Sequence, residues 1–146
     1  MTGSPTLSFR IATVEDCRAL AAMNHQLIRD EGHRNSMSEA ELEQRMRGWI
    51  AGEYRAVLFE RNHRVVAYAL YREQTDEIYL RQLFVVREHR REGIGRQAIE
   101  LLRTSVWPKS RRLTVDVLVA NQSALAFWRA VGYSDYCLTL EILPQS

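Results

Sequence analysis

The sequence predicts a mixed α/β (α+β) fold, with a central sheet that carries helices on both faces. Apolar residues follow a helical period between Thr13 and Gly52 and a strand period directly after Gly52. Beyond that point, strand-like runs alternate with helices, and the whole order reads β-α-α-β-β-β-α-β-α-β. Hairpins join antiparallel neighbours and helical crossovers join parallel ones, so this order predicts a sheet with both kinds of pairing.

The first part of the chain is expected to form one short strand and two amphipathic helices. Residues 7–12 alternate as in a half-buried strand, and Thr13 is a good N-cap for a helix that Gly32 ends. Ser38 and Glu41 form a capping box for a second helix. Apolar side chains recur on one face of each helix: Leu20, Met23, Leu27 and Ile28, then Leu42, Met46, Trp49 and Ile50.

The rest of the chain is expected to alternate strands and helices. Two β-rich runs, 55–60 and 65–71, flank residues 61–64, a pattern typical of a hairpin. The remaining elements are a strand at 78–86, a helix at 93–107, a strand at 113–119, a helix at 123–131 and a strand at 133–142.

Composition indicates one globular domain over residues 1–146, with a core at about 8–142. The 146 residues are 46% hydrophobic and 26% charged, and the net charge of +2 does not favour nucleic acid as a partner. No apolar run approaches the roughly 20 residues that cross a membrane, and the N-terminus lacks a secretory pattern, so we expect a cytoplasmic protein. Cys17 and Cys137 show no metal-ligand spacing, and we expect free thiols and no metal.

A basic turn with two glycines joins the strand at 78–86 to the next helix. The N–H groups that open a helix bind anions, and Gly93 and Gly95 let a phosphate approach the backbone. A dinucleotide-binding turn would need a third glycine where Ala98 stands, and a Walker A loop would need Lys-[Ser/Thr]. An anion site is favoured, and a solvated helix start stays open as the alternative. The basic residues are Arg87, Arg90, Arg91 and Arg96.

Three segments resemble the GNAT superfamily of N-acetyltransferases. Arg90-Arg91-Glu92-Gly93-Ile94-Gly95 is similar to its [QR]-x-x-G-x-[GA] signature, and Leu83-Phe84-Val85 to the L-x-V end of its fourth strand. Residues 121–133 resemble its N-x-x-A-x-x-[FL]-Y-x-x-x-G-[FY] block. The resemblance covers about residues 8–142. It implies the acyl-CoA N-acyltransferase (GNAT) fold: a twisted mixed sheet of six or seven strands, parted at the coenzyme and flanked by about four helices.

The resemblance also implies an enzyme that moves the acetyl group of acetyl-CoA directly to a primary amine in a ternary complex. The turn would hold the pyrophosphate, the fourth strand would pair with the pantetheine, and the Leu83 N–H would donate to the thioester carbonyl. The acceptor would be a small molecule, a peptide or a protein, and a homodimer is compatible. The alternative is a catalytically silent module that binds coenzyme A or acyl-CoA. The implied coenzyme-binding residues are Leu83, Phe84, Val85, Arg90, Arg91, Glu92, Gly93, Ile94, Gly95, Arg96, Asn121, Ala124, Phe127 and Trp128.

The residues that transfer protons are harder to identify from the sequence than the coenzyme-binding residues. Trp128 stands where the family often has a tyrosine, and an indole N–H cannot deliver a proton as a phenol does. Glu77 and Tyr79 share one face of the strand and are the catalytic candidates, with a solvated acid and a half-buried sheet residue as the alternative. Residues 29–35 are expected near the acceptor. The acidic residues of this segment could attract a cationic amine, while His33 and Arg34 could bind a carboxylate of the acceptor. A solvated loop without a binding role explains the same residues equally well.

Overall fold

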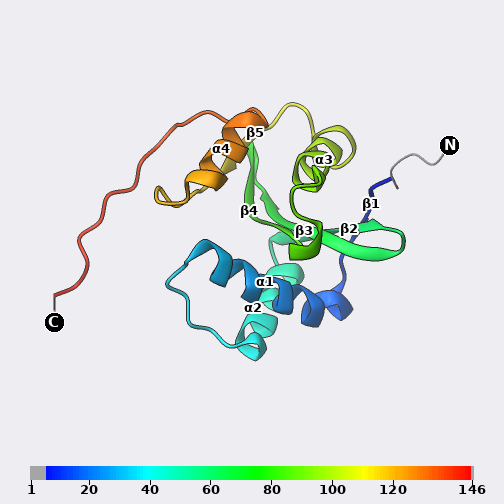
Figure 1. The fold of residues 1–146 in the computed structure, drawn as a ribbon, viewed down its shortest axis with the longest axis horizontal. Coiled ribbons are helices and arrows are strands. Elements are labelled where there is room, and N and C mark those ends of the chain that lie inside the picture. The colour runs from blue at the N-terminus through cyan, green and yellow to red at the C-terminus, as the bar shows by residue number, and fades with distance from the viewer. Residues whose placement is uncertain (1–5, 146) are drawn as a thin grey trace. The chain divides into compact units, whose positions relative to one another are not determined.

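The computed structural model describes residues 6–145 of the chain (Figure 1). The chain divides into two compact units, Met1–Asp116 and Val117–Ser146, which are described separately below. The first unit contains the whole sheet, and the second contains one helix. The expected single domain over residues 1–146 stays a prediction.

The elements of the first unit follow the predicted order. The strands are β1 (Ser8–Ile11), β2 (Tyr54–Arg61), β3 (Arg64–Glu73), β4 (Glu77–Val85) and β5 (Arg112–Val115). The helices are α1 (Cys17–Glu31), α2 (Glu39–Ala51) and α3 (Ile94–Leu101), which continues as a π-helix, Leu102–Val106. Short 3₁₀ turns at Val14–Asp16 and Arg87–His89 precede α1 and α3.

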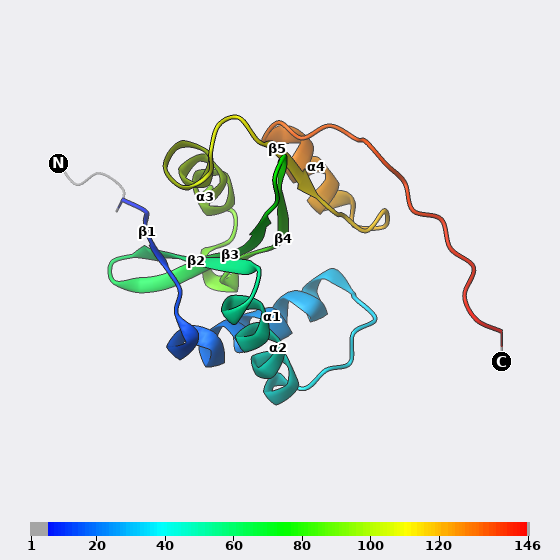
Figure 2. The same cartoon turned by 180° about the vertical axis from the view of Figure 1, so that it is seen from behind.

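The five strands form one sheet in the order β1-β2-β3-β4-β5. All neighbours are antiparallel except β4 and β5, which are parallel because a helical crossover joins them. Helices α1 and α2 lie on one face of this sheet and α3 lies on the other, as the two opposite views show (Figures 1 and 2). The predicted mixed sheet with helices on both faces is therefore confirmed.

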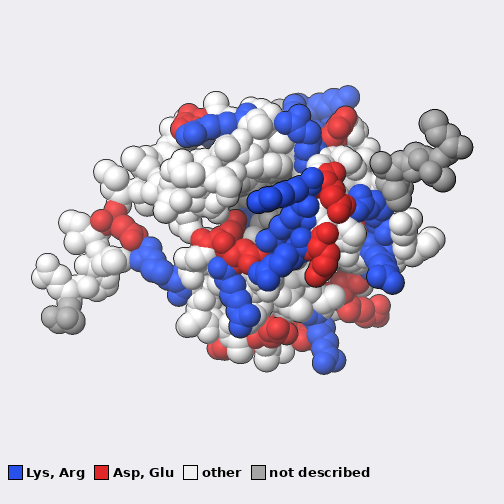
Figure 3. Space-filling view, viewed as in Figure 1, with Lys and Arg blue, Asp and Glu red and all other residues white. Residues whose placement is uncertain are grey.

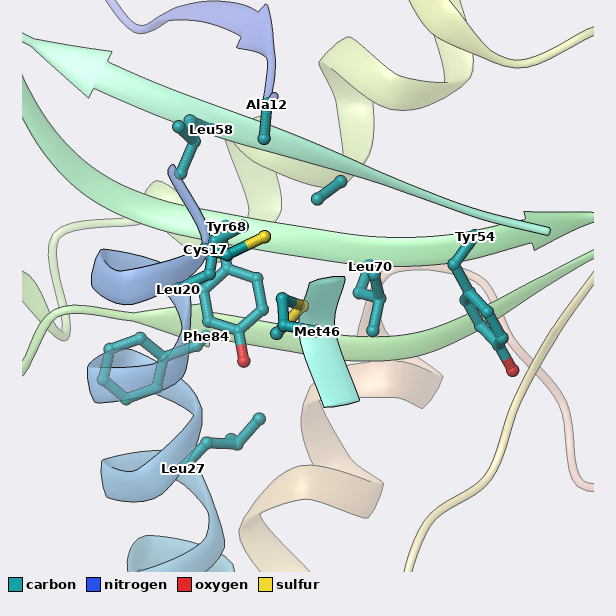
Figure 4. Close-up of a cluster of buried hydrophobic side chains, with 11 residues drawn as sticks. Ala12, Cys17, Leu20, Leu27, Met46, Tyr54, Leu58, Tyr68, Leu70 and Phe84 are labelled. Carbon is teal, nitrogen blue, oxygen red and sulfur yellow. The ribbon is translucent and has the colours of Figure 1, made fainter. Parts of the chain in front are cut away.

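Two cores hold these layers together. On the α1/α2 face, buried side chains from both helices and from β2, β3 and β4 pack into one cluster that includes Leu20, Met46, Leu58 and Tyr68 (Figure 4). On the other face, the buried stripe of α3 and its extension consists of Ile94, Ala98, Ile99 and Leu102. Behind it, Trp107 meets the Tyr71 ring edge-on, with ring centroids 5.5 Å apart.

Local signals in the sequence explain how several elements begin. The capping box before α2 is present: the Ser38 amide donates to the Glu41 carboxylate at 2.9 Å, and the Glu41 amide donates to the Ser38 hydroxyl at 3.2 Å. The β2–β3 turn places Asn62 and His63 at φ 54° and 64°, as a two-residue hairpin turn of type I′ requires.

The expected last strand, residues 133–142, is not formed. Residues 133–145 contain no helix or strand, and the side chains of Leu138, Leu140 and Ile142 are largely exposed. A strand has no hydrogen bonds of its own, so an alternating pattern becomes a strand only against a partner edge. The described sheet therefore has five strands rather than six or seven, and β5 also ends early, at Val115 instead of residue 119. None of the described helices is long and apolar enough to cross a membrane.

Candidate active site

The edge of β4 opens where its pairing with β5 stops. The last parallel pair is Leu80 with Val115, although β4 continues to Val85. At the same level β4 carries a bulge, because Tyr71 faces Leu80 while Leu70 faces Gln82, which leaves Arg81 without a partner residue on β3. Beyond this bulge, β3 is the one strand among the described residues that pairs with β4.

The backbone groups on this open edge follow from the ladder geometry. The Val86 amide donates to the Val66 carbonyl at 2.8 Å, and hydrogen-bonded residues alternate along an antiparallel pair. Phe84 therefore bonds towards β3, whereas Leu83 and Val85 direct their N–H and C=O groups to the open edge. The Val85 carbonyl accepts a bond from Nε of Arg90 at 2.9 Å, which agrees with this direction. The amide of Leu83 thus lies on an edge that no strand of residues 6–145 covers.

The turn after β4 exposes the amide groups that begin α3. Arg91 and Gly93 both adopt left-handed backbone, with φ 67° and 78°. The Gln97 amide donates to the Gly93 carbonyl at 3.0 Å, so the amides of the first helical turn have no acceptor inside the helix. A side chain at Gly93 would meet only the tip of Gln97, at 4.0 Å, and the backbone is therefore open to an approaching group. These features fit a diphosphate.

The arginines of the turn fall into two sets. Asp30, near the end of α1, accepts hydrogen bonds from Arg90 at 2.5 Å and from Arg87 at 3.0 Å. Burial alone would raise the pKa of Asp30, but the bonds from Arg90, Gln26 and Arg87 lower it. Arg91 and Arg96 are exposed, and the described residues of the first unit place no carboxylate within ion-pair distance of either. Acidic and basic side chains lie next to one another near the middle of the face of the protein that Figure 3 shows.

A second ion pair neutralises the acid in the turn. Glu92 pairs with Arg61 of the hairpin and lies 3.3 Å from Nδ1 of His89. The hydrogen bond from Arg61 is the main cause of the lowered pKa of Glu92. Because its charge is balanced, Glu92 repels a bound phosphate less than a free carboxylate would. Arg61 was not among the sequence candidates, since it lies in a distant hairpin and no motif marks it.

The two catalytic candidates are each bonded to residues on or just after β5. Glu77 accepts a hydrogen bond from the Thr114 hydroxyl at 2.7 Å, and the Tyr79 hydroxyl donates to Asp116 at 2.8 Å. Burial, and then the bond to Asp116, raises the pKa of Tyr79 to about 12, so its phenol stays protonated at neutral pH. At about 3.3 Å per residue, Glu77 lies roughly 20 Å and Tyr79 roughly 13 Å from Leu83 along the strand.

Asp116 is a residue that the sequence reasoning missed. It follows Val115, which pairs with Leu80, so Asp116 is level with the bulge and nearer to Leu83 than Glu77 is. The sequence signal for Asp116 was the alternation of side chains along β5. Thr114 and Asp116 face the same side of the sheet, and Glu77 and Tyr79 face that side from the neighbouring strand β4.

The second unit carries the remaining candidate residues on or beside α4 (Gln122–Ala130). Asn121 caps this helix: its side-chain oxygen accepts from the Ala124 amide at 3.1 Å and from the Ser123 hydroxyl at 3.2 Å. The Trp128 ring meets Phe127 and Tyr133 edge-on, at centroid distances of 4.9 and 5.3 Å. Trp128 therefore has a packing role within its own unit.

The described residues include no cluster of three or more His, Cys, Asp or Glu that could hold a metal ion. Both cysteines are free thiols: Cys17 is buried and Cys137 is exposed.

The sheet, the opened β4 edge and the turn before α3 agree with the fold of GNAT acetyltransferases. The sequence model of the acetyltransferase (GNAT) family matches residues 20–133, and the chain belongs to this family. No curated sequence matches the chain.

Solved structures share this fold at low sequence identity. A possible acetyltransferase from Clostridium difficile 630 has a TM-score of 0.76 and 16% identity, covering 95% of this chain and 99% of its own. The aminoglycoside N-acetyltransferase AAC(6')-Iy in complex with CoA has a TM-score of 0.77 and 11% identity, covering 100% and 99%. The aminoglycoside 6'-N-acetyltransferase AAC(6')-IG from Acinetobacter haemolyticus has a TM-score of 0.74 and 17% identity, covering 95% and 99%. The resemblance inferred from the motifs is thereby confirmed, and family membership supports an acetyltransferase activity.

Proposed function

We propose that this protein transfers the acetyl group of acetyl-CoA to a primary amine by direct attack in a ternary complex. The observation that carries the proposal is the amide of Leu83, which lies on the uncovered edge of β4. Ten residues further on, Gly93 opens the helix whose first amides suit a diphosphate. One extended ligand with a diphosphate at one end and a thioester at the other matches these two features, and acetyl-CoA is such a ligand.

Different residues of the chain would then bind different parts of acetyl-CoA. The first-turn amides of α3, together with Arg91 and Arg96, would hold the diphosphate, while Leu83, Phe84 and Val85 would line the pantetheine. Arg90, tied to Asp30 and Val85, would keep the turn in place rather than bind phosphate. The family resemblance also implies Asn121, Ala124, Phe127 and Trp128 as coenzyme contacts, and this assignment stays a prediction. The two free cysteines favour a reducing compartment, and the proposal places the protein in the cytoplasm.

Acetyl-CoA supplies an activated thioester when it is bound. The Leu83 N–H would donate to the carbonyl oxygen as negative charge develops there. A neutral amine would form the new C–N bond, the C–S bond would break with the electron pair leaving on the coenzyme A thiolate, and the amine proton would pass to a base. Tyr79 is not that base at neutral pH, because its phenol is protonated. Glu77 and Asp116 are the carboxylates to be tested. Neither cysteine has to carry the acetyl group.

Removing the Leu83 N–H tests the proposal directly. Because this N–H faces away from β3, Leu83→Pro removes no ladder hydrogen bond, and proline is tolerated at such an edge. Leu83→Ala, the matched control, shortens the side chain and keeps the N–H. We expect Leu83→Pro to lower kcat by about 10²–10³ with little change in acetyl-CoA affinity, and Leu83→Ala to lose far less. Equal losses in the two variants would remove this amide from the mechanism.

The turn can be tested with a pair of substitutions of equal size. Asn and Asp both tolerate the left-handed backbone at Gly93, but only Asp adds a negative charge. Calorimetry should show a loss of acetyl-CoA affinity for Gly93→Asp at least tenfold larger than for Gly93→Asn. Similar affinities for the two variants would argue against a diphosphate at this turn.

The alternative function is a silent module that binds coenzyme A without turnover. Trp128 favours it, because the indole cannot protonate the leaving thiolate. Thiol release from acetyl-CoA, measured across a panel of amines, separates the two. Release matched by acetylated amine supports the enzyme, whereas tight binding of acetyl-CoA with no thiol release supports the module.

A further inference from the structure

A cluster of arginines and aromatic rings lies on the α1/α2 face of the sheet. Tyr54, Arg72 and Tyr79 stand in register on β2, β3 and β4. The guanidinium carbon of Arg72 is 5.5 Å from the centre of the Tyr54 ring and 5.9 Å from that of Tyr79. Helix α2 adds Trp49, whose ring centroid lies 5.4 Å from that of Tyr54. The cluster therefore combines one helix with three adjacent strands.

Two further arginines converge on Trp49. The guanidinium carbon of Arg45 lies 4.3 Å from the centre of the Trp49 ring, and that of Arg81 lies 4.7 Å from it. Nη1 of Arg81 also donates to the Tyr54 hydroxyl at 3.3 Å. Two guanidinium groups of like charge thus contact the same ring by cation–π interactions.

No acid balances these two charges. The described residues of the first unit place no carboxylate within ion-pair distance of Arg45 or Arg81. The Nε atoms of Arg45 and Arg72 are buried and have no hydrogen-bond partner. Burial, and then the charge of Arg81, lowers the pKa of Arg45. Buried donors without acceptors are costly, so the described contacts leave the hydrogen-bonding capacity of this cluster incompletely used.

The acids around the cluster already have partners. Glu53 lies 3.7 Å from Nη1 of Arg72, Asp116 accepts from Tyr79, and Glu31 lies 3.0 Å from His33. Asp30, one of the acids expected to attract a cationic amine, is bound by two arginines of the turn. Among the described residues of the first unit, these contacts leave Arg45 and Arg81 as the guanidinium groups of the cluster that no carboxylate contacts.

The cluster lies next to the proposed transfer site. Arg81 is the bulge residue of β4 and precedes Leu83 by two residues, or roughly 7 Å along the strand. We infer that the amine acceptor carries a carboxylate, and that Arg45 and Arg81 bind this carboxylate while the amine faces the Leu83 amide. This inference rests on the proposed acetyl transfer and names its substrate class. It also sets this protein apart from enzymes that accept polycationic aminoglycosides.

The test compares acceptors that differ only in the carboxylate. L-amino acids and their carboxamides share the same amine and side chain, and an aminoglycoside serves as the cationic probe. The amine of the carboxamide is the less basic of the two, so intrinsic reactivity at neutral pH favours the amide. We expect kcat/KM to be at least tenfold higher for the free acid of the preferred pair, and the aminoglycoside to be a poor acceptor.

Variants then assign the preference to the two arginines. Arg45→Gln and Arg81→Gln should each reduce the acid-to-amide ratio about tenfold, and Arg81→Lys should retain part of it. Arg47→Gln is the matched control: it removes the same charge from α2 at an exposed residue that pairs with Glu43. A purely structural role predicts lower stability with an unchanged ratio, and that result would overturn the inference.

The failure of this inference is distinguishable from the failure of the proposed function. Thiol release with amides or aminoglycosides preferred over acids would overturn the carboxylate site and leave acetyl transfer standing. If no acceptor releases thiol, calorimetry with N-acetyl amino acids and their amides still tests the site. The site is supported if the protein binds the N-acetyl amino acid and the double variant R45Q/R81Q does not. Equal binding of the acid and its amide overturns the site.

Discussion

The carboxylate of Asp30 accepts a hydrogen bond from Nη2 of Arg90 at 2.5 Å and joins the end of α1 to the turn before α3. Arg90 is the first residue of the motif that resembles a pyrophosphate-binding signature. Its second bond, from Nε to the Val85 carbonyl, anchors the same side chain to β4. The guanidinium thus fixes the turn between a strand and a distant helix, and its charge is already balanced.

Asp30→Asn should weaken the fold in a pH-dependent way. The pKa of Asp30 is lower in the folded state than its ordinary value of 3.8, so its stabilisation is present above that value and is lost as the pH falls through the lower folded value. We expect the variant to lose about 1 kcal/mol of unfolding free energy at pH 7. Urea titrations should show the difference shrinking below pH 3.8. A difference that persists at lower pH would mean that the charge of Asp30 is not the cause.

Arg91→Gly should separate coenzyme binding from stability. Arg91 adopts left-handed backbone, which glycine takes without strain, so the unfolding free energy should change by less than about 1 kcal/mol. Loss of the positive charge of Arg91 should weaken acetyl-CoA binding severalfold at low salt and less at high salt. Arg103→Gln, in the π-helix that continues α3, is the control for net charge. Equal losses of acetyl-CoA affinity in both variants would indicate that Arg91 acts through the overall electrostatic field of the protein and not through a local contact with the coenzyme.

Most of the fold could be predicted from the sequence, because the signals that begin and end its elements are local. The capping box of Ser38 and Glu41, the stop at Gly32 and the hairpin turn each depend on a few neighbouring residues. The last strand depends on a partner edge far away in the chain, and alternation at 133–142 predicted a strand that the described residues do not form. The early end of β5 at Val115 has the same origin.

The sequence motifs predicted those parts of the candidate site that lie within the motifs themselves. The glycine turn and the L-x-V segment directed attention to α3 and β4, and both lie in the first unit. Pairings over long sequence distances left no such mark: Arg61 with Glu92, Tyr79 with Asp116, and Arg81 with Trp49. These contacts depend on strand register and on the β4 bulge, which composition and periodicity do not specify.

Trp128→Tyr should leave acetyl transfer intact or raise it. The ring contacts of Trp128 with Phe127 and Tyr133 are edge-on packing contacts, which a tyrosine ring can largely retain. Its phenol would add a proton donor for the leaving thiolate. Steady-state kinetics with one amine acceptor measures the outcome, and Trp128→Phe controls for ring size without the hydroxyl. A loss beyond tenfold, about 1.4 kcal/mol, would assign the indole a direct role.

The hydrogen bond between Tyr79 and Asp116 leads to a prediction about the catalytic base. Because the Tyr79 pKa is about 12, Tyr79→Phe should leave the acidic limb of the kcat/KM profile unchanged and lower kcat less than tenfold. Asp116 is level with the bulge, so Asp116→Asn should remove that limb and lower kcat by 10²-fold or more. Glu77→Gln, an equal change of charge farther from Leu83, should preserve the limb. Loss of the limb in Glu77→Gln alone would instead identify Glu77 as the base, with Asp116 acting only to orient Tyr79.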